Sequence, residues 1–240
     1  MIETNKIYCM DALELLKQIQ DNSVDLVLTD PPYNCSNSKI AFADKHYESL
    51  NEEWDKGFKI DFFPIASKKI REGGSILIYC SHHLLGEYLS KIPPELKLRQ
   101  IIHWRKEGVV PSICNRLYAW SIEYILWFTK GVNYTFNKKE WQNYTDVIVT
   151  KLKDNEQKTQ LHPTQKHLSV MRRLIQVHSN EGDLVIDPFC GSGTTALACK
   201  QLNRKFICGD IESKYVAISN KRLSQQILSF EKQKLGELKT

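Results

Sequence analysis

Short apolar runs of strand length alternate with helix-patterned segments along the 240 residues, and this alternation constrains the fold more than any other feature. The pattern predicts strands at 24–29, 75–79, 100–104, 123–128, 184–187 and 206–209, and helices at 13–19, 62–72, 169–178, 194–202 and 213 to about 235. Asp61 is a plausible cap for the helix at 62–72, and Gly73-Gly74 would end it. Such an order is typical of an α/β protein with a mostly parallel sheet.

Two polar segments interrupt the alternation. Residues 34–53 follow a strand directly and are longer than most α/β connections, and residues 130–161 have no clean period. We interpret both as substrate-contacting elements built on a rigid sheet, within one domain that spans residues 1–240.

Composition excludes several classes of protein. The 33 Lys and Arg against 28 Asp and Glu give a net charge of +5, which is compatible with nucleic-acid binding but does not imply it. No apolar run approaches the ~18 residues of a membrane span, and no secretory signal is visible, so we expect a cytoplasmic protein. The seven cysteines are dispersed without a C-x-x-C pair, which predicts reduced thiols. His82-His83 lacks a second ligand pair, which favours a loop, and we predict no metal.

Asp30-Pro31-Pro32-Tyr33 follows the predicted strand at 24–29. Open α/β sheets bind ligands just outside the carboxyl ends of their strands. The two prolines give a stiff loop with carbonyl acceptors, Asp30 adds a carboxylate, and Tyr33 offers a flat face. This set suits a planar ring with an exocyclic amine, although a strand-ending turn with a capping Asp remains an alternative.

A glycine-rich turn, Asp187-Pro-Phe-Cys-Gly-Ser-Gly-Thr194, separates a predicted strand from a predicted helix. It lacks the spacing and the lysine of a P-loop, and it meets the dinucleotide fingerprint only in relaxed form, with Ala196 at the third glycine position. Asp210 follows the next strand, close to the ~20-residue separation expected of a ribose-binding acid. The turn and this acid together predict an adenosine-type cofactor.

A third motif, His162-Pro-Thr-Gln-Lys166, precedes the predicted helix at 169–178. Its Pro and Thr suit a helix start, and Lys166 could hold a carboxylate. In this order the three motifs resemble those of the beta-class amino DNA methyltransferases, and the resemblance spans residues 11 to about 223. His167 departs from the family, which usually has a second proline there. The Asp before Pro-Pro-Tyr is more similar to adenine-N6 than to cytosine-N4 members.

The resemblance implies a fold, a cofactor and a reaction. The fold would be Rossmann-like, with circularly permuted motif order and a mostly parallel sheet. Residues 104–106 and 123–128 look like the family's last two sheet strands, the final one antiparallel. S-adenosylmethionine would donate a methyl group to a flipped-out adenine in a short DNA site, with no metal. In the catalytic tetrapeptide, Asp30 and the Pro31 carbonyl would hold the amine, next to Pro32, and Tyr33 would stack on the base. The implied cofactor contacts are Asp11, Asp30, His162, Thr164, Lys166, Asp187, Pro188, Phe189, Gly191, Gly193, Thr194 and Asp210.

Basic residues predict where DNA would contact the chain. Residues 97–116 include five basic residues and one acidic residue. A basic-aromatic stretch follows in the segment 130–161, which the resemblance implies is a target-recognition insertion. The predicted DNA contacts are Arg99, Arg105, Lys106, Arg116, Lys138 and Lys139.

Several alternatives stay open at this point. The methylated base could be cytosine at N4 or a base in RNA, and a less favoured alternative is a nucleotide-binding module without catalysis. DNA could be bound as a duplex or as a single strand. Dimers are common in the class, so a homodimer is one candidate assembly, and a cognate restriction endonuclease is a candidate partner.

Overall fold

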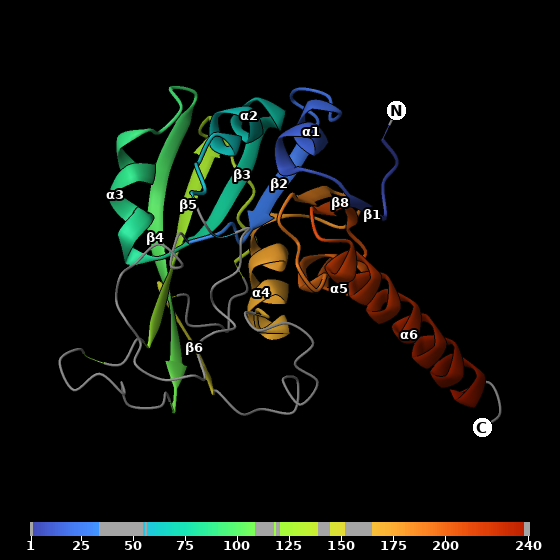
Figure 1. The fold of residues 1–240 in the computed structure, drawn as a ribbon. Helices are drawn as coiled ribbons and strands as arrows, with labels where there is room; N and C mark the ends of the chain where they lie inside the picture. The colour runs from blue at the N-terminus through green and yellow to red at the C-terminus, as the bar shows by residue number, and fades with distance from the viewer. Residues whose placement is uncertain are drawn as a thin grey trace.

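The computed structural model describes residues 2–33, 55, 57–108, 118, 121–138, 145–151 and 165–237, with side chains as far as residue 225 (Figure 1). The strands within these ranges are β1 (Lys6–Cys9), β2 (Val24–Thr29), β3 (Ile70–Cys80), β4 (Leu96–Glu107), β5 (Ile122–Lys130), β6 (Val147–Lys151), β7 (Leu184–Asp187) and β8 (Lys205–Asp210). The helices are α1 (Ala12–Lys17), α2 (Phe62–Lys69), α3 (His82–Ser90), α4 (Leu168–His178), α5 (Thr194–Gln201) and α6 (Ser213–Glu237).

All described strands form one sheet in the order β1-β8-β7-β2-β3-β5-β4-β6. β5 pairs antiparallel with both β3 and β4, whereas the other pairs are parallel, so β5 is the strand of the described sheet that runs against the rest. The predicted α/β class with a mostly parallel sheet and one antiparallel strand is therefore confirmed. That strand, expected at 123–128, is β5, which lies between β3 and β4.

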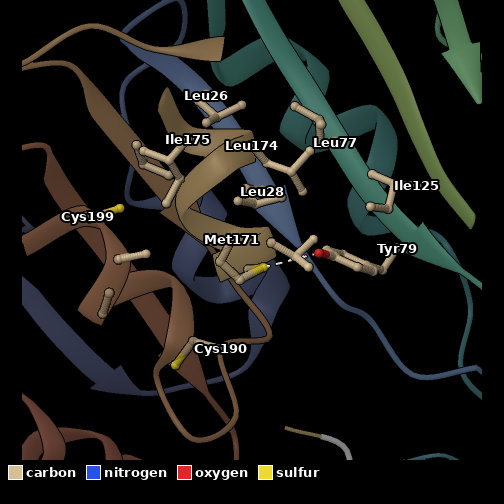
Figure 2. Packing of buried hydrophobic residues seen from close by; sticks show 14 of the residues in the cluster. Leu26, Leu28, Leu77, Tyr79, Ile125, Met171, Leu174, Ile175, Cys190 and Cys199 are labelled. Carbon is tan, nitrogen blue, oxygen red and sulfur yellow. Dashed lines mark hydrogen bonds between the residues drawn. The ribbon is translucent and has the colours of Figure 1, made fainter. Parts of the chain in front are cut away.

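The sheet separates two apolar layers because alternate side chains of a strand point to opposite faces. Leu26 and Leu28 of β2 pack with α4 and α5 residues such as Leu174, whereas Val27 packs with α1 and α2 residues such as Leu15. Figure 2 shows the first layer, in which the Tyr79 hydroxyl lies 3.3 Å from the Met171 sulfur. Helices thus cover both faces of the sheet.

The helix predicted at 62–72 ends earlier, at Lys69, and Gly73 and Gly74 lie within β3. The β2–β3 register jumps between Val24 and Leu26, which opposes Ser75, so the glycine pair sits in an irregularity of the strand. A Cβ on Gly74 would lie 2.9 Å from the Asp25 carbonyl oxygen, which explains why a glycine is needed where the two backbones approach. Asp61 precedes α2 but its side chain makes no capping hydrogen bond.

Three elements were not predicted. β1 and β6 are short, and α3 begins at His82, where we expected a loop. α3 buries Leu84 and Tyr88, four residues apart, against the sheet. That spacing was available in the sequence, but Gly86 lies between the two and weakens the helical pattern.

The predicted catalytic-site loop, 34–53, lies outside the described residues. Of the predicted insertion 130–161, the ranges 130–138 and 145–151 are described, and the second contains β6 at the edge of the described sheet. No helix within the described ranges is long and apolar enough to cross a membrane.

Candidate active site

The predicted motifs meet at the centre of the sheet, where β2 lies beside β7. From β2 the chain continues to β3 on one side, and from β7 it continues to β8 on the other, so this is the switch point at which open α/β sheets bind ligands. Asp30 follows β2, and the glycine-rich turn follows β7. The Thr29 hydroxyl donates a hydrogen bond of 2.7 Å to Asp187 Oδ1, which joins the two strand ends directly.

The Asp187 carboxylate is buried and fully engaged by the chain itself. Besides Thr29, it accepts hydrogen bonds from the Thr195 hydroxyl of α5 and from the Phe189 backbone N–H, at 3.1 Å. Burial raises the pKa of Asp187 to about 7, and the hydrogen bonds oppose this rise. Asp187 therefore fastens the turn to β2 and α5.

The turn itself needs glycine for its backbone. Gly191 and Gly193 have φ angles of 50° and 77°, in the left-handed region that favours glycine. The Gly191 N–H donates to Asp210 Oδ2 at 2.9 Å, and Asp210 Oδ1 accepts from the Glu212 N–H at 2.9 Å. These bonds hold the predicted ribose-binding acid against the turn, and burial raises the pKa of Asp210.

Asp11 lies at the neighbouring strand end. Cys9 of β1 pairs with Asp210 of β8, and the Met10 N–H donates to the Asp210 carbonyl at 3.0 Å. Asp11 Oδ1 caps α1 by accepting the Leu13 N–H at 2.8 Å. Four parts of the predicted site thus lie next to one another at the carboxyl ends of the strands, in the strand order β1-β8-β7-β2. They are Asp11, Asp210, the glycine turn and Asp30.

The turn also contacts α2 and α6. Phe189 packs its ring against Phe62, with centroids 5.0 Å apart, and Pro188 is buried. Thr194 is the first residue of α5, and its hydroxyl lies 3.3 Å from Arg222 of α6. The turn is therefore supported on both sides.

Asp30 and Tyr33 contact each other. The Tyr33 hydroxyl donates a hydrogen bond of 2.6 Å to Asp30 Oδ1, and the Tyr33 N–H donates to Asp55 Oδ1 at 2.8 Å. Burial raises the pKa of both the Asp30 carboxyl and the Tyr33 hydroxyl. For Asp30, the positive charge of Lys166 opposes the effect of burial.

Lys166 connects Asp30 to a buried row of alternating charges. Its Nζ, on a side chain that is 8% exposed, lies 2.9 Å from Asp30 Oδ2 and 2.8 Å from Glu123 Oε2. Glu123 Oε1 is in turn paired with Lys106. We call Asp30, Lys166, Glu123 and Lys106 the charge row. With Asp30 ionised, the row's two carboxylates and two ammonium groups carry no net charge.

The ammonium groups decide the ionisation of Glu123. Burial alone would raise its pKa, but Lys166 and Lys106 outweigh burial and lower the pKa to about 2. The two carboxylates in turn raise the pKa of Lys166, although burial opposes this. Glu123 and Lys166 are therefore charged at neutral pH.

The sequence suggested that Lys166 could hold a carboxylate, and its Nζ contacts two carboxylates of this chain. Its contact with the cofactor, which the resemblance implies, stays a prediction. A buried ammonium group binds the nearest anions available, and those belong to residues far from it in sequence.

Glu123 was missed altogether as a site residue, because candidate residues were sought at the carboxyl ends of strands. β5 runs in the opposite direction, so its first residues reach the active-site edge. Cys80, the last residue of β3, pairs with Tyr124, next to Glu123. The signal that could have found Glu123 is an acid at the start of the strand expected to be antiparallel.

The predicted DNA contacts divide between the two ends of the sheet. Arg105 pairs with Ile122, so it lies at the active-site end, and its guanidinium contacts Glu107. Arg99 lies at the far end, where it donates to the Gly131 carbonyl at 2.7 Å. Nine residues of β5 separate these ends, roughly 25 Å.

Lys138 is also at the far end, because the N–H of the adjacent Asn137 donates to the Val177 carbonyl near the carboxyl end of α4. Lys106 is at the active-site end, where it is paired with Glu123. Contact with DNA stays a prediction for all of these residues, and their positions favour Arg105 over the others. The remaining predicted residues, His162, Thr164, Arg116 and Lys139, lie outside the described residues.

The described site offers acceptors and backbone amides rather than metal ligands. Within the described ranges, no group of three or more His, Cys, Asp and Glu side chains could hold a metal ion. An acceptor pair at Asp30 and Pro31, beside a glycine turn and two further acids, can orient an amine next to an adenosine-type ligand.

Comparison with known proteins gives consistent results. A family model described as DNA methylase matches residues 24–221. Type II methyltransferase M2.MboI of Moraxella bovis is 31% identical over 90% of this chain and 86% of its own length, and M2.DpnII of Streptococcus pneumoniae is 29% identical over 90% and 88%.

Solved structures agree with the same fold. The M1.HpyAVI–SAM complex superposes with a TM-score of 0.70 at 30% identity, covering 90% of this chain and 98% of that chain. The cytosine-N4-specific PvuII DNA methyltransferase superposes with a TM-score of 0.69 at 20% identity over 89% and 84%, a likeness of fold alone.

Proposed function

Because the chain belongs to the DNA methylase family, we propose that it transfers the methyl group of S-adenosylmethionine to the N6 amine of an adenine in DNA. The observation that carries the proposal is the position of Asp30 and Pro31 at the end of β2, joined through the Thr29–Asp187 hydrogen bond to the glycine turn after β7. Asp at the first position of the tetrapeptide favours adenine N6 over cytosine N4.

The residues along the sheet edge fit this cofactor. Asp11 and Asp210 are acceptors at adjacent strand ends, suited to the adenine amine and the ribose hydroxyls respectively. The glycine turn brings backbone and the amino end of α5 to the next position, suited to the carboxylate at the methionine end. When bound, S-adenosylmethionine supplies an electrophilic methyl group on its sulfonium. An M1.HpyAVI structure, 30% identical to this chain, contains S-adenosylmethionine.

Asp30 and Pro31 would activate the base by orientation and charge. The exocyclic amine of adenine is a poor nucleophile because its lone pair is delocalised into the ring. The Asp30 carboxylate and the Pro31 carbonyl each accept one of its N–H bonds, which draws the nitrogen toward tetrahedral geometry and aims its lone pair at the methyl group. As the N–C bond forms, the S–C bond of the donor would break and S-adenosylhomocysteine would leave. The nitrogen would then lose one N–H proton to the Asp30 carboxylate and so to solvent, with no covalent enzyme intermediate and no general acid.

Tyr33 would receive the base. An adenine within a duplex cannot reach this site, so the base must be flipped out or already unpaired. Stacking on the Tyr33 ring would contribute about 1–3 kcal/mol toward the cost of extrusion. We further propose that the chain acts beside a restriction endonuclease, because two relatives are named type II methyltransferases.

Product analysis tests the proposed function. The protein is incubated with S-adenosylmethionine and genomic DNA from a methylation-free host, and the DNA is digested to nucleosides for mass spectrometry. We expect N6-methyladenine, and single-molecule sequencing of the same DNA would reveal the site. If N4-methylcytosine is found instead, the target base is cytosine and not adenine. If RNA is methylated and DNA is not, DNA is not the substrate.

A further inference from the structure

We propose that Glu123 is a positioning residue of the methyl-transfer site, which shares Lys166 with Asp30 and so holds the Asp30 carboxylate in place with its negative charge only partly offset. This proposal rests on the proposed function, because it assigns a role in the reaction that Asp30 would perform. Glu123 lies on β5, between β3 and β4, and its carboxylate faces the end of β2 without being part of any of the predicted motifs.

The contacts of Lys166 support the proposal. A lysine ammonium has three N–H bonds. Nζ of Lys166 lies 2.9 Å from Asp30 Oδ2, 2.8 Å from Glu123 Oε2 and 3.2 Å from the Tyr33 hydroxyl. Nζ also lies 5.1 Å from the centres of the Tyr33 and Tyr79 rings. With contacts on each of these sides, Lys166 is fixed where it meets Asp30.

Glu123 sets the strength of that contact. If Lys166 faced Asp30 alone, the pair would be a one-to-one ion pair, and the charge of Asp30 would be largely neutralised. Because Glu123 shares Lys166, Asp30 keeps more of its negative charge for the amine of the substrate. Lys106 pairs with the other oxygen of Glu123 and lies 4.6 Å from the Trp104 ring centre, so Glu123 is itself held.

The groups that face Asp30 come from several elements. Lys166 precedes α4, Glu123 is on β5, and Tyr33 follows Asp30 in the chain. From the strands on either side, Tyr79 and Cys80 of β3 and Asp187 of β7 also interact electrostatically with Asp30. Burial raises the pKa of the Tyr79 hydroxyl, and it raises the pKa of Cys80 to about 12. These two groups are therefore neutral near pH 7.

This arrangement makes opposite predictions for two substitutions. Lys166→Met removes a cation beside Asp30, so the pKa of Asp30 rises. Glu123→Gln removes a like charge, so the pKa of Asp30 falls, while Lys166 pairs more closely with it. Methyl transfer requires ionised Asp30. The fall in rate at low pH, the acidic limb of the pH–rate profile, therefore follows the pKa of Asp30.

The experiment measures single-turnover methylation of DNA, with saturating tritiated S-adenosylmethionine, from pH 5 to pH 9. We expect the acidic limb to move to higher pH in Lys166→Met and to lower pH in Glu123→Gln. At the plateau, we expect the Glu123→Gln rate to fall by about 10- to 100-fold because Asp30 is drawn toward Lys166, which offsets more of its negative charge. Affinity for S-adenosylmethionine, measured by calorimetry, should stay the same in Glu123→Gln.

A matched control is Glu87→Gln, which removes a partly exposed acid paired with Lys91 on α3. It should change neither the plateau nor the pH profile. Thermal unfolding identifies variants that fail to fold, and Glu123→Asp, which keeps the charge, should restore part of the rate if Glu123→Gln is unfolded.

Two results would overturn the proposal. One is a folded Glu123→Gln protein with the wild-type rate and pH–rate profile. The other is a shift of the acidic limb in the same direction in Lys166→Met and Glu123→Gln. Failure of the proposed function is distinguishable, because the wild-type protein itself would then methylate no DNA.

Discussion

At the scale of the residue, the reaction depends on the oxygen atoms of Asp30. One of them accepts the Tyr33 hydroxyl and the other contacts Lys166. A carboxylate has about four acceptor positions, so Asp30 can still accept an N–H from a substrate amine. Asp30 is therefore both anchored and available.

We expect Asp30→Ala to abolish methyl transfer, with a loss of at least about 100-fold, because the amine loses its charged acceptor. The affinity for S-adenosylmethionine should largely survive, since Asp11, Asp210 and the glycine turn are unchanged. Tritium transfer to DNA measures the first quantity and calorimetry the second. Asp30→Asn serves as the control of similar size. Loss of cofactor affinity in Asp30→Ala would make Asp30 a binding residue instead.

Residues such as Asp30, Tyr33 and Asp210 could be predicted because each lies at or shortly after the end of a strand, where local sequence determines position. The partners of Lys166 could not be predicted in this way. Glu123 is 43 residues away from it and Asp30 is 136 residues away, so their contact depends on the order of the strands in the sheet.

At the scale of the element, a pair of glycines can end a helix or lie within a strand, and the surrounding fold decides between the two. Gly73-Gly74 would suit the end of a helix, but α2 stops before them and β3 includes them. The local sequence is consistent with either outcome. The close approach of Gly74 to Asp25 in β2 arises only when the sheet forms, and it is this contact that selects the strand.

The raised pKa of Asp187, which joins β2, β7 and α5, predicts that the folding stability of the protein depends on pH. Its folded-state pKa of about 7 lies above its ordinary value of 3.8, so its favourable contribution is complete below about pH 4 and is lost as pH rises through 7. From pH 5 to pH 8, wild-type stability should therefore fall by about 3 kcal/mol relative to Asp187→Asn.

Urea unfolding of both proteins at pH 5 and pH 8 measures this difference. Asp183→Asn, a change at a more exposed carboxyl just before β7, is the control and should leave most of the pH dependence intact. A constant difference between wild type and Asp187→Asn across this range would mean that Asp187 stays charged in the folded protein.

At the scale of the whole molecule, the cations predicted to contact DNA lie at both ends of the sheet. Arg105 is at the end that carries Asp30, whereas Lys138 is exposed at the other end. The local excess of positive charge in the sequence was therefore a weaker guide than the strand directions, because it could not tell which end of the sheet each residue would reach.

Arg105→Ala should reduce the slope of log Kd against log salt for duplex DNA by about one, because one phosphate contact is lost. Lys138→Ala is the matched variant and should leave the slope unchanged. Fluorescence anisotropy from 50 to 200 mM salt measures both. An equal reduction in the two variants would mean that DNA contacts both ends of the sheet.

The neutrality of the charge row predicts that salt affects DNA binding and the rate of methyl transfer differently. Counterions compete with a protein for phosphates at its surface, but they hardly enter a buried set of charges that already cancels. Once DNA is saturating, the single-turnover rate should be the same at 50 and 200 mM salt, even though complex formation weakens. Added electrolyte would thus act on capture of the substrate and leave the chemical step untouched.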